Sequence, residues 1–330
     1  MTPLGKRVLA VLLSLTVTVA LLEVALRLVE PAPRYADTSV DNIFTGFRLP
    51  NDWAAPREAP GIVRVLVLGD SFTWGDGVHE EDAYPHRMQF RLNLDDPQRP
   101  YRVLNAGRNG LNTVDERLLL DSMGLLASQP DLVLLGFTIN DPEPSDREKA
   151  EDLWRPTGRR GPVGRAELEL YRRSRLVALV WNRLENSRQR RATNAYMEAL
   201  FDPDSDHWRA CVGALTSFRD HLGERGIPFV VAVLPAFDSP FDDAYPYHRQ
   251  HQQLFDALAS LGIPALDLWP LYEGVEARRL AVTPFTDAHP NELAHRIAAD
   301  FLAARVRECL EVETAGDGGR SRSWTCRGDD

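Results

Sequence analysis

The feature that most constrains the fold is a series of short apolar runs separated by patterns typical of helices. The runs are almost continuously apolar and do not alternate with polar residues, as expected for strands buried on both faces of a sheet. They span residues 62–68, 101–105, 132–137, 228–234 and 265–268. Helical patterns lie between and after them, at residues 83–94, 114–128, 207–225, 247–261 and 292–309. This alternation predicts an α/β domain with a parallel sheet covered by helices on both faces.

The amino-terminal segment predicts membrane targeting. A basic pair at residues 6–7 precedes residues 8–22, which carry no charge. This stretch is shorter than the roughly 20 residues of a full span, so it fits the core of a signal peptide or a signal anchor that continues further. We favour an anchor over residues 1–30, because no clear Ala-x-Ala site follows and Glu23 can pair with Arg27 one turn away. The basic flank places the rest of the chain outside the cytoplasm.

The remaining chain divides by composition. Residues 31–60 are rich in proline, alanine and polar residues and are expected to form a linker or stalk. An α/β domain is expected over residues 61–310, interrupted by an insertion at about 142–205. Residues 311–330 have the composition of a flexible tail.

One stretch of the insertion is strongly basic. Residues 155–191 hold eleven arginines and three glutamates, although the whole chain has a net charge of −10. The stretch is either a solvated helix face or a cap that faces anionic lipid headgroups or an acidic polysaccharide, and the solvated face is the preferred interpretation. The acidic net charge gives no reason to expect nucleic acid as a partner.

The three cysteines do not form a metal-binding pattern. Cys309 and Cys326 bracket a polar tail and can form a disulfide in an exported protein, which leaves Cys211 as a buried thiol. The histidines also lack the helical spacing of metal ligands. We therefore expect no metal and no cofactor.

Four polar segments are expected to meet at one edge of the sheet. Gly-Asp-Ser at residues 69–71 follows the first predicted strand, residues 105–110 follow the second, and residues 138–141 follow the third. Residues 287–291 precede the last predicted helix. Each segment alone fits an ordinary turn or helix cap. Together they indicate a ligand site, because an open parallel sheet binds ligands at the carboxyl ends of its strands.

These segments supply every group that acyl transfer through a serine needs. Ser71 is the candidate nucleophile, His289 the candidate base and Asp287 the residue that orients the base. The candidate oxyanion donors are the backbone N–H groups of Ser71 and Gly110 and the side-chain amide of Asn140. Glycine lets the main chain approach the substrate closely, and a neutral amide donates without a charge to desolvate.

At these residues the chain resembles the SGNH hydrolases, also called the GDSL esterase and lipase family. The resemblance covers residues 63–305 apart from the arginine-rich insertion, with four motif blocks in the family's order. It implies a flavodoxin-like three-layer α/β/α sandwich, a Ser71 nucleophile completed by Asp287 and His289, and an oxyanion hole formed with Gly110 and Asn140.

Two positions depart from the family's pattern. Thr138 stands where the third block usually carries glycine, two residues before Asn140. Only Ala288 separates Asp287 from His289, where the family often has two residues. A backbone carbonyl can therefore also take part in orienting His289. Asp70 is interpreted as a residue that shapes the nucleophile turn.

The sequence thus predicts a membrane-anchored, extracytoplasmic serine esterase. The expected substrates are O-acyl esters, above all O-acetyl esters, of cell-surface carbohydrate or lipid. One alternative is a polysaccharide O-acetyltransferase that uses the same triad. A second alternative is a non-catalytic carbohydrate-binding module that retains the fold.

Overall fold

The computed structural model describes two compact units of the chain. One comprises residues 1–36 and 155–193, and the other comprises residues 37–154 and 194–330. Within them, the described residues are 3–29, 61–144, 174, 176–177, 180, 193–237, 239–283 and 287–310. The two units are described separately below.

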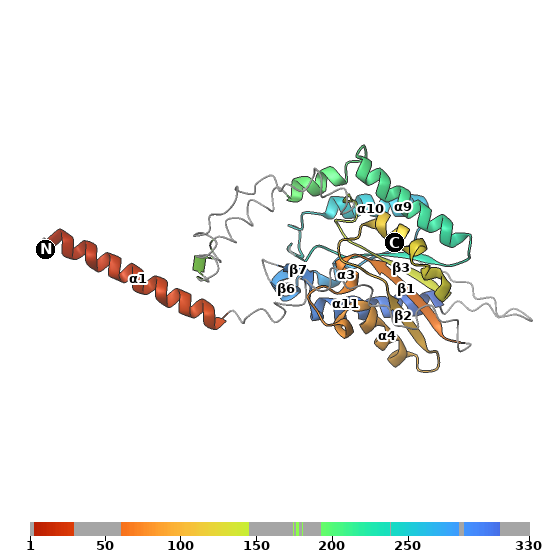
Figure 1. The fold of residues 1–330 in the computed structure, drawn as a ribbon, viewed down its shortest axis with the longest axis horizontal. Coiled ribbons are helices and arrows are strands. Elements are labelled where there is room, and N and C mark those ends of the chain that lie inside the picture. The colour runs from red at the N-terminus through yellow and green to blue at the C-terminus, as the bar shows by residue number, and fades with distance from the viewer. Residues whose placement is uncertain are drawn as a thin grey trace, which may run out of the picture. The chain divides into compact units, whose positions relative to one another are not determined.

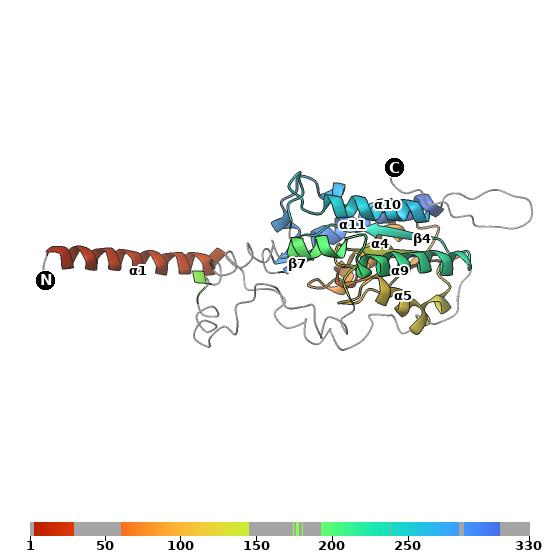
Figure 2. The ribbon, with the colours of Figure 1, turned by 90° about the horizontal axis from the view of Figure 1, so that it is seen from above.

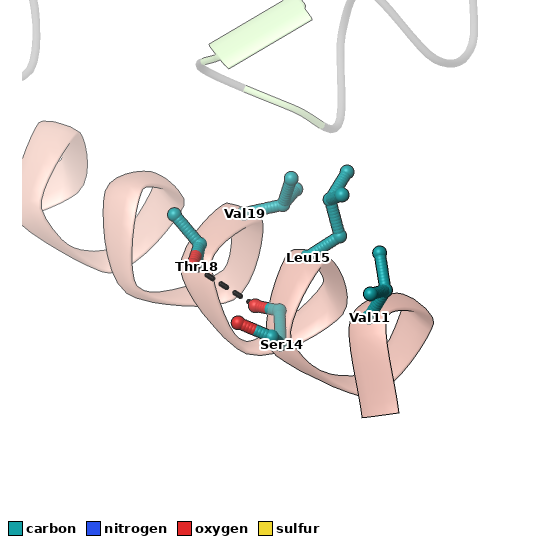
Figure 3. A pocket seen from close by; sticks show the side chains of 5 residues that line it. All are labelled: Val11, Ser14, Leu15, Thr18 and Val19. Atoms are coloured by element: carbon teal, nitrogen blue, oxygen red, sulfur yellow. Dashed lines mark hydrogen bonds between the residues drawn. The ribbon is translucent and has the colours of Figure 1, made fainter. Parts of the chain in front are cut away.

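The first unit contains a long apolar helix, α1 (Pro3–Val29), shown in red in Figures 1 and 2. Its candidate membrane span covers residues 3–28, and the most apolar 18-residue stretch of this span has a mean hydropathy of 2.4 with none of it buried. The Thr16 and Thr18 hydroxyls donate to the carbonyl oxygens of Leu12 and Ser14 at 2.9 Å, so both hydroxyl groups have a partner inside the helix. Figure 3 shows an open hollow on this helix, lined by Val11, Ser14, Leu15, Thr18 and Val19. The helix is long and apolar enough to span a membrane, and a signal sequence has the same properties.

Glu23 accepts hydrogen bonds from both parts of the first unit, α1 and residues 174 and 176. Its carboxylate accepts a hydrogen bond from Arg27 Nε at 2.9 Å, which confirms the predicted pair. The second carboxylate oxygen accepts from Ser174 Oγ and from the backbone N–H of Leu176, both at 2.9 Å. Glu23 on α1 thus binds the arginine-rich stretch at Ser174 and Leu176. Most of residues 155–191 lie outside the described part of the chain, so the two interpretations of that stretch stay predictions.

The second unit is built on a five-stranded parallel sheet with the order β2-β1-β3-β4-β5. The strands are β1 (Val63–Gly69), β2 (Tyr101–Asn105), β3 (Leu132–Phe137), β4 (Phe229–Val233) and β5 (Ala265–Asp267). All five predicted runs form these strands, with ends that differ by no more than one residue. The order 2-1-3-4-5 is that of flavodoxin-like folds, so the predicted fold class is confirmed.

Helices cover both faces of the sheet (Figures 1 and 2). In β1, Leu66 and Leu68 pack into one core with α5, α9 and α10, while Val65 and Val67 pack into the other with α4 and α11. These helices are α4 (Tyr84–Asp95), α5 (Thr113–Ser122), α9 (Asp206–Gly223), α10 (His248–Leu261) and α11 (Glu292–Leu310). Successive residues of a strand point to opposite faces, so an uninterrupted apolar run serves both cores.

Two parts of the fold differ from the prediction. The helix expected over residues 114–128 is interrupted, because Gly124 adopts a left-handed conformation with φ 59° between α5 and a short 3₁₀ turn, Leu125–Ser128. The sequence also did not predict the antiparallel pair β6 (Ala281–Thr283) and β7 (Asp287–Pro290). The remaining short elements are α3 (Ser71–Trp74) and 3₁₀ turns at Glu80–Asp82, Trp269–Tyr272 and Ala277–Arg279. Residues 193–200 are also helical.

Two of the three cysteines are described, and they have the expected states, one bonded and one free. Cys309, near the end of α11, is disulfide-bonded. Cys211 is a free, buried thiol in α9. Cys326, the expected partner of Cys309, lies outside the described residues.

Gly107 provides a test of how closely the loop after β2 packs on the nucleophile helix. A Cβ atom at Gly107 would lie 2.5 Å from the backbone nitrogen of Trp74 and 2.7 Å from the backbone carbon of Thr73, and backbone atoms cannot move aside cheaply. We expect Gly107→Ala to lower the free energy of unfolding by about 1–3 kcal/mol, measured by urea denaturation. The matched variant Gly213→Ala lies in α9 with no atom near the new methyl group and is expected to be neutral or stabilising by up to about 1 kcal/mol. Equal effects of the two variants would contradict this packing.

Candidate active site

The nucleophile turn connects β1 to α3. Asp70 caps this helix, because its Oδ1 accepts a hydrogen bond from the backbone N–H of Phe72 at 2.9 Å. Its backbone oxygen accepts from the N–H of Trp74, also at 2.9 Å. Ser71 is the first helical residue and stays partly exposed at the carboxyl edge of the sheet. The interpretation of Asp70 as the residue that shapes this turn is confirmed.

Ser71 and His289 meet across 218 residues of sequence. The distance from His289 Nε2 to Ser71 Oγ is 2.8 Å. His289 lies in β7, and the ring of Phe72 packs edge-on against its imidazole with 5.4 Å between ring centroids. The ring of Phe237 in turn packs against the ring of Phe72, with 5.9 Å between ring centroids. With the imidazole proton on Nδ1, Nε2 is placed to accept the serine proton.

Asp287 lies in the same short strand as His289. Its backbone pairs with Thr283 of β6. The position of its side chain lies outside the described structure. The assignment of Asp287 as the group that orients His289 therefore stays a prediction.

The loop that carries Gly110 is tied to the nucleophile turn. The side-chain amide of Asn105 donates to the backbone oxygen of Thr73 at 2.9 Å, and its oxygen accepts from the N–H of Gly107 at 3.0 Å. The N–H of Arg108 donates to the backbone oxygen of Gly69 at 3.0 Å. Gly110 itself has φ 77°. The loop predicted to supply an oxyanion donor is thus held against β1 and α3.

Asn140 reaches the same place from the end of β3. Its Oδ1 lies 2.5 Å from Thr138 Oγ1, and its Nδ2 lies 3.5 Å from Asp70 Oδ2. In this orientation the amide nitrogen of Asn140 faces the nucleophile turn. An amide nitrogen carries two protons, and the second is available to a substrate oxygen.

Thr138, the residue that replaces the family's glycine, is the centre of a buried polar network. Its Oγ1 contacts Asn140 and also lies 2.9 Å from Asp70 Oδ2 and 3.0 Å from Asp141 Oδ1. A hydroxyl has one proton to donate and three acceptor oxygens surround it. A protonated carboxyl group supplies the further donor that this arrangement of acceptors favours. Burial raises the pKa of both Asp70 and Asp141, and the neighbouring Asp70 charge adds to the effect at Asp141.

Glu116 is a third buried acid beneath the site, on α5. Its side chain is fully buried, and neither carboxylate oxygen has a hydrogen-bond partner among the described residues. Burial, reinforced by the Asp141 charge, raises the pKa of Glu116 well above its usual range. Leaving such a group charged and unpaired would be costly, so it is held as the neutral acid. Within the described parts of the chain, no group of histidine, cysteine and acidic side chains is arranged to hold a metal ion.

The structure brings some of the predicted site residues together and leaves the position of the Asp287 side chain undescribed. It brings Ser71 and His289 into contact and sets Asn140 beside the nucleophile turn. The sequence analysis missed the network around Thr138. The signal was its departure from the family's glycine, which is a reason to look for a hydroxyl with a function. It also missed Glu116, because an acid in the first turn of a helix is usually a solvated residue that favours the helix dipole.

Comparison with known proteins identifies the family of this domain. Residues 67–297, well over half of the chain, match the GDSL-like Lipase/Acylhydrolase family. These residues therefore form an SGNH-type ester hydrolase domain. The chain belongs to the GDSL-like lipase/acylhydrolase family. No curated protein sequence matches it.

Several solved structures are similar. A two-domain esterase active on acetylated mannans has 15% sequence identity and a TM-score of 0.45, covering 78% of this chain and 50% of its own. This chain therefore spans about half the length of that esterase. An acetylxylan esterase from Geobacillus stearothermophilus has 14% identity and a TM-score of 0.45, covering 73% and 92%. A putative lipolytic protein of the G-D-S-L family from Desulfitobacterium hafniense has 13% identity and a TM-score of 0.41, covering 73% and 98%.

The neutral state of Glu116 predicts a pH-dependent stability. Because the folded-state pKa is raised above the unfolded value, the folded state binds the proton more tightly. Stability from this group is complete below the unfolded pKa of about 4.3 and is lost as pH rises towards the folded pKa. Glu116→Gln removes this loss. We expect the stability of the variant relative to wild type to rise from pH 5 to pH 7, by up to about 1.4 kcal/mol per pH unit.

The measurement is urea unfolding of both proteins at each pH, followed by tryptophan fluorescence. Comparing the two proteins cancels the contributions of groups that titrate alike in both. A difference that stays constant over this range would contradict a neutral Glu116.

Proposed function

We propose that the protein hydrolyses O-acyl esters, with O-acetyl esters of carbohydrate as its first candidate substrates, through Ser71 and His289. The observation that carries this proposal is the 2.8 Å contact between Ser71 Oγ and His289 Nε2 inside a GDSL-family domain. The acetyl group and the sugar are the class on which the esterases described above act, and they are extended to this chain as the proposal to be tested.

The chemistry follows from the positions of the two side chains. His289 Nε2 takes the proton as Ser71 Oγ bonds to the ester carbonyl carbon, and the carbonyl oxygen becomes an oxyanion. The carbon–oxygen bond to the alcohol then breaks, and the departing oxygen takes the proton from Nε2. Water attacks the acyl-serine in the second half of the cycle and gives its proton to His289. The bond between the acyl carbon and Ser71 Oγ then breaks, Oγ takes that proton back from Nε2, and the carboxylic acid is released.

The proposed oxyanion hole draws on three elements. The donors are the backbone N–H groups of Ser71 and Gly110 and the amide of Asn140. Their proposed role is supported by the ties that hold the Gly110 loop to β1 and by the Thr138 contact that orients the Asn140 amide. Asp287 is proposed to orient His289, since residues two apart in a strand share a face.

We also propose that α1 anchors the protein in a membrane with the catalytic unit outside the cytoplasm. The support is the length and hydropathy of the helix, its exposed surface, and the basic residues Lys6 and Arg7 before its apolar part. The bonded pair Glu23–Arg27 lies near the end of the helix, where a charged pair can reach the interface.

The esterase proposal is tested by substituting the nucleophile and one oxyanion donor. With p-nitrophenyl acetate and the full chain in detergent, we expect Ser71→Ala to abolish turnover. Asn140→Ala is expected to lower kcat by about a hundredfold or more, because one oxyanion donor contributes on that order. Asn194→Ala is a matched control, since Asn194 bonds to Tyr247 in another part of the catalytic unit.

The outcomes separate the alternatives. Activity that persists in Ser71→Ala would remove the serine mechanism. Near-normal turnover of Asn140→Ala would remove Asn140 from the oxyanion hole. Wild-type protein that releases little acetate but acetylates an added polysaccharide would favour the O-acetyltransferase instead.

The anchor is tested by fractionating cells that produce the full chain. We expect the protein to stay with the membranes after an alkaline carbonate wash and to retain residues 1–30 by intact mass. An external protease should degrade the catalytic unit in spheroplasts. A soluble product that lacks the apolar segment would instead identify it as a cleaved signal peptide.

A further inference from the structure

A carboxylate that the mechanism does not use lies beside the catalytic pair. Asp76 Oδ2 is 3.9 Å from His289 Nε2, the same nitrogen that contacts Ser71 Oγ at 2.8 Å. About a quarter of each side chain, Asp76 and His289, is exposed. Asp76 is therefore accessible to a substrate bound at Ser71.

The backbone holds Asp76 in place. The N–H of Asp76 donates to the backbone oxygen of Ser71 at 3.0 Å. Glycines flank it on both sides, with φ 85° at Gly75 and φ 80° at Gly77, which side chains other than glycine rarely adopt. A Cβ atom would lie 2.6 Å from Ala83 Cβ at Gly75 and 2.7 Å from Val282 at Gly77. The turn is thus closely packed on both sides, and its conformation aims Asp76 at the site.

The position of Asp76 gives it a specific relation to the substrate. To be protonated, the departing alcohol oxygen must approach His289 Nε2 within hydrogen-bond distance. Asp76 Oδ2, 3.9 Å from Nε2, then lies within reach of a substituent on the alcohol carbon that is bonded to the departing oxygen. An ionised carboxylate only accepts hydrogen bonds, so it favours a hydroxyl there and repels an anionic group.

We propose that Asp76 selects the alcohol part of the substrate. It binds esters whose alcohol carries a second hydroxyl, on the carbon adjacent to the one that bears the ester oxygen, as in a monoacylated diol or a sugar. It rejects esters of anionic alcohols. This inference rests on the proposed esterase function and deepens it. It concerns the alcohol, whereas Gly110 and Asn140 act on the acyl carbonyl. Asp76 is a substrate-binding residue in this scheme and takes no part in proton transfer.

The test uses two esters that differ in one hydrogen-bond donor. 2-Hydroxyethyl acetate and 2-methoxyethyl acetate share the acetyl group and the neighbouring oxygen, and only the first can donate to Asp76. For the full chain in detergent, we expect kcat/KM to favour the hydroxyl ester about tenfold, as for one hydrogen bond to a charged group. Asp76→Ala is expected to bring this ratio close to one. Asp220→Asn, an exposed acid near the end of α9, is the matched control and should keep the wild-type ratio.

A second comparison isolates the charge. The acetyl ester of glycolate places a carboxylate where 2-hydroxyethyl acetate has its hydroxymethyl group. We expect wild type to hydrolyse this anionic ester poorly and Asp76→Asn, which keeps the shape without the charge, to improve its kcat/KM about tenfold or more relative to 2-hydroxyethyl acetate. The thermal midpoint of each variant confirms that it is folded.

The outcomes distinguish this inference from the proposed function. Hydrolysis that depends on Ser71, with the same hydroxyl-to-methoxy ratio in wild type and Asp76→Ala, would overturn the inference and leave the esterase intact. No hydrolysis of any of the esters above the level of Ser71→Ala would overturn the proposed function and this inference with it.

Discussion

The contact between Ser71 and His289 is the interaction on which the site depends, and the whole catalytic unit contributes to it. Ser71 follows the first strand of the sheet, and His289 comes 218 residues later in β7. The parallel sheet fixes one partner, because β1 lies between β2 and β3 and ends at the edge where ligands bind. The antiparallel pair β6–β7 fixes the other. Loss of either arrangement would separate the two atoms, so fold and chemistry share one constraint.

Three acidic side chains near this contact are buried, although burying a charged carboxylate costs free energy. Asp70, Asp141 and Glu116 are all buried, and burial raises the pKa of each. Thr138 reconciles two of them, since its hydroxyl lies between Asp70 and Asp141 and also reaches Asn140. Protonation of a carboxyl group in this network lowers the negative charge close to the Asn140 amide.

The sequence predicted those parts of the molecule that repeat a simple pattern. Uninterrupted apolar runs such as residues 132–137 predicted the strands of a sheet covered on both faces, and Ser71 and His289 stood in motifs that share one edge. It could not predict β6 and β7, which are three and four residues long and carry too little pattern. Glu116 was hidden for a different reason: only tertiary packing decides whether an acid in a first helical turn meets solvent or the core.

The arrangement also divides the substrate between two parts of the fold. In the proposed mechanism Ser71, Gly110 and Asn140, which follow strands of the large sheet, surround the place where the acyl carbonyl reacts. The small strand pair bears on the alcohol side that we propose for Asp76: β7 carries His289, and Val282 of β6 packs on the turn that presents Asp76. Changes in β6 and β7 can therefore alter which alcohol is accepted while the acyl-transfer machinery of the sheet stays the same. A constant sheet edge with a variable strand pair is a physical route by which one fold can serve many esters.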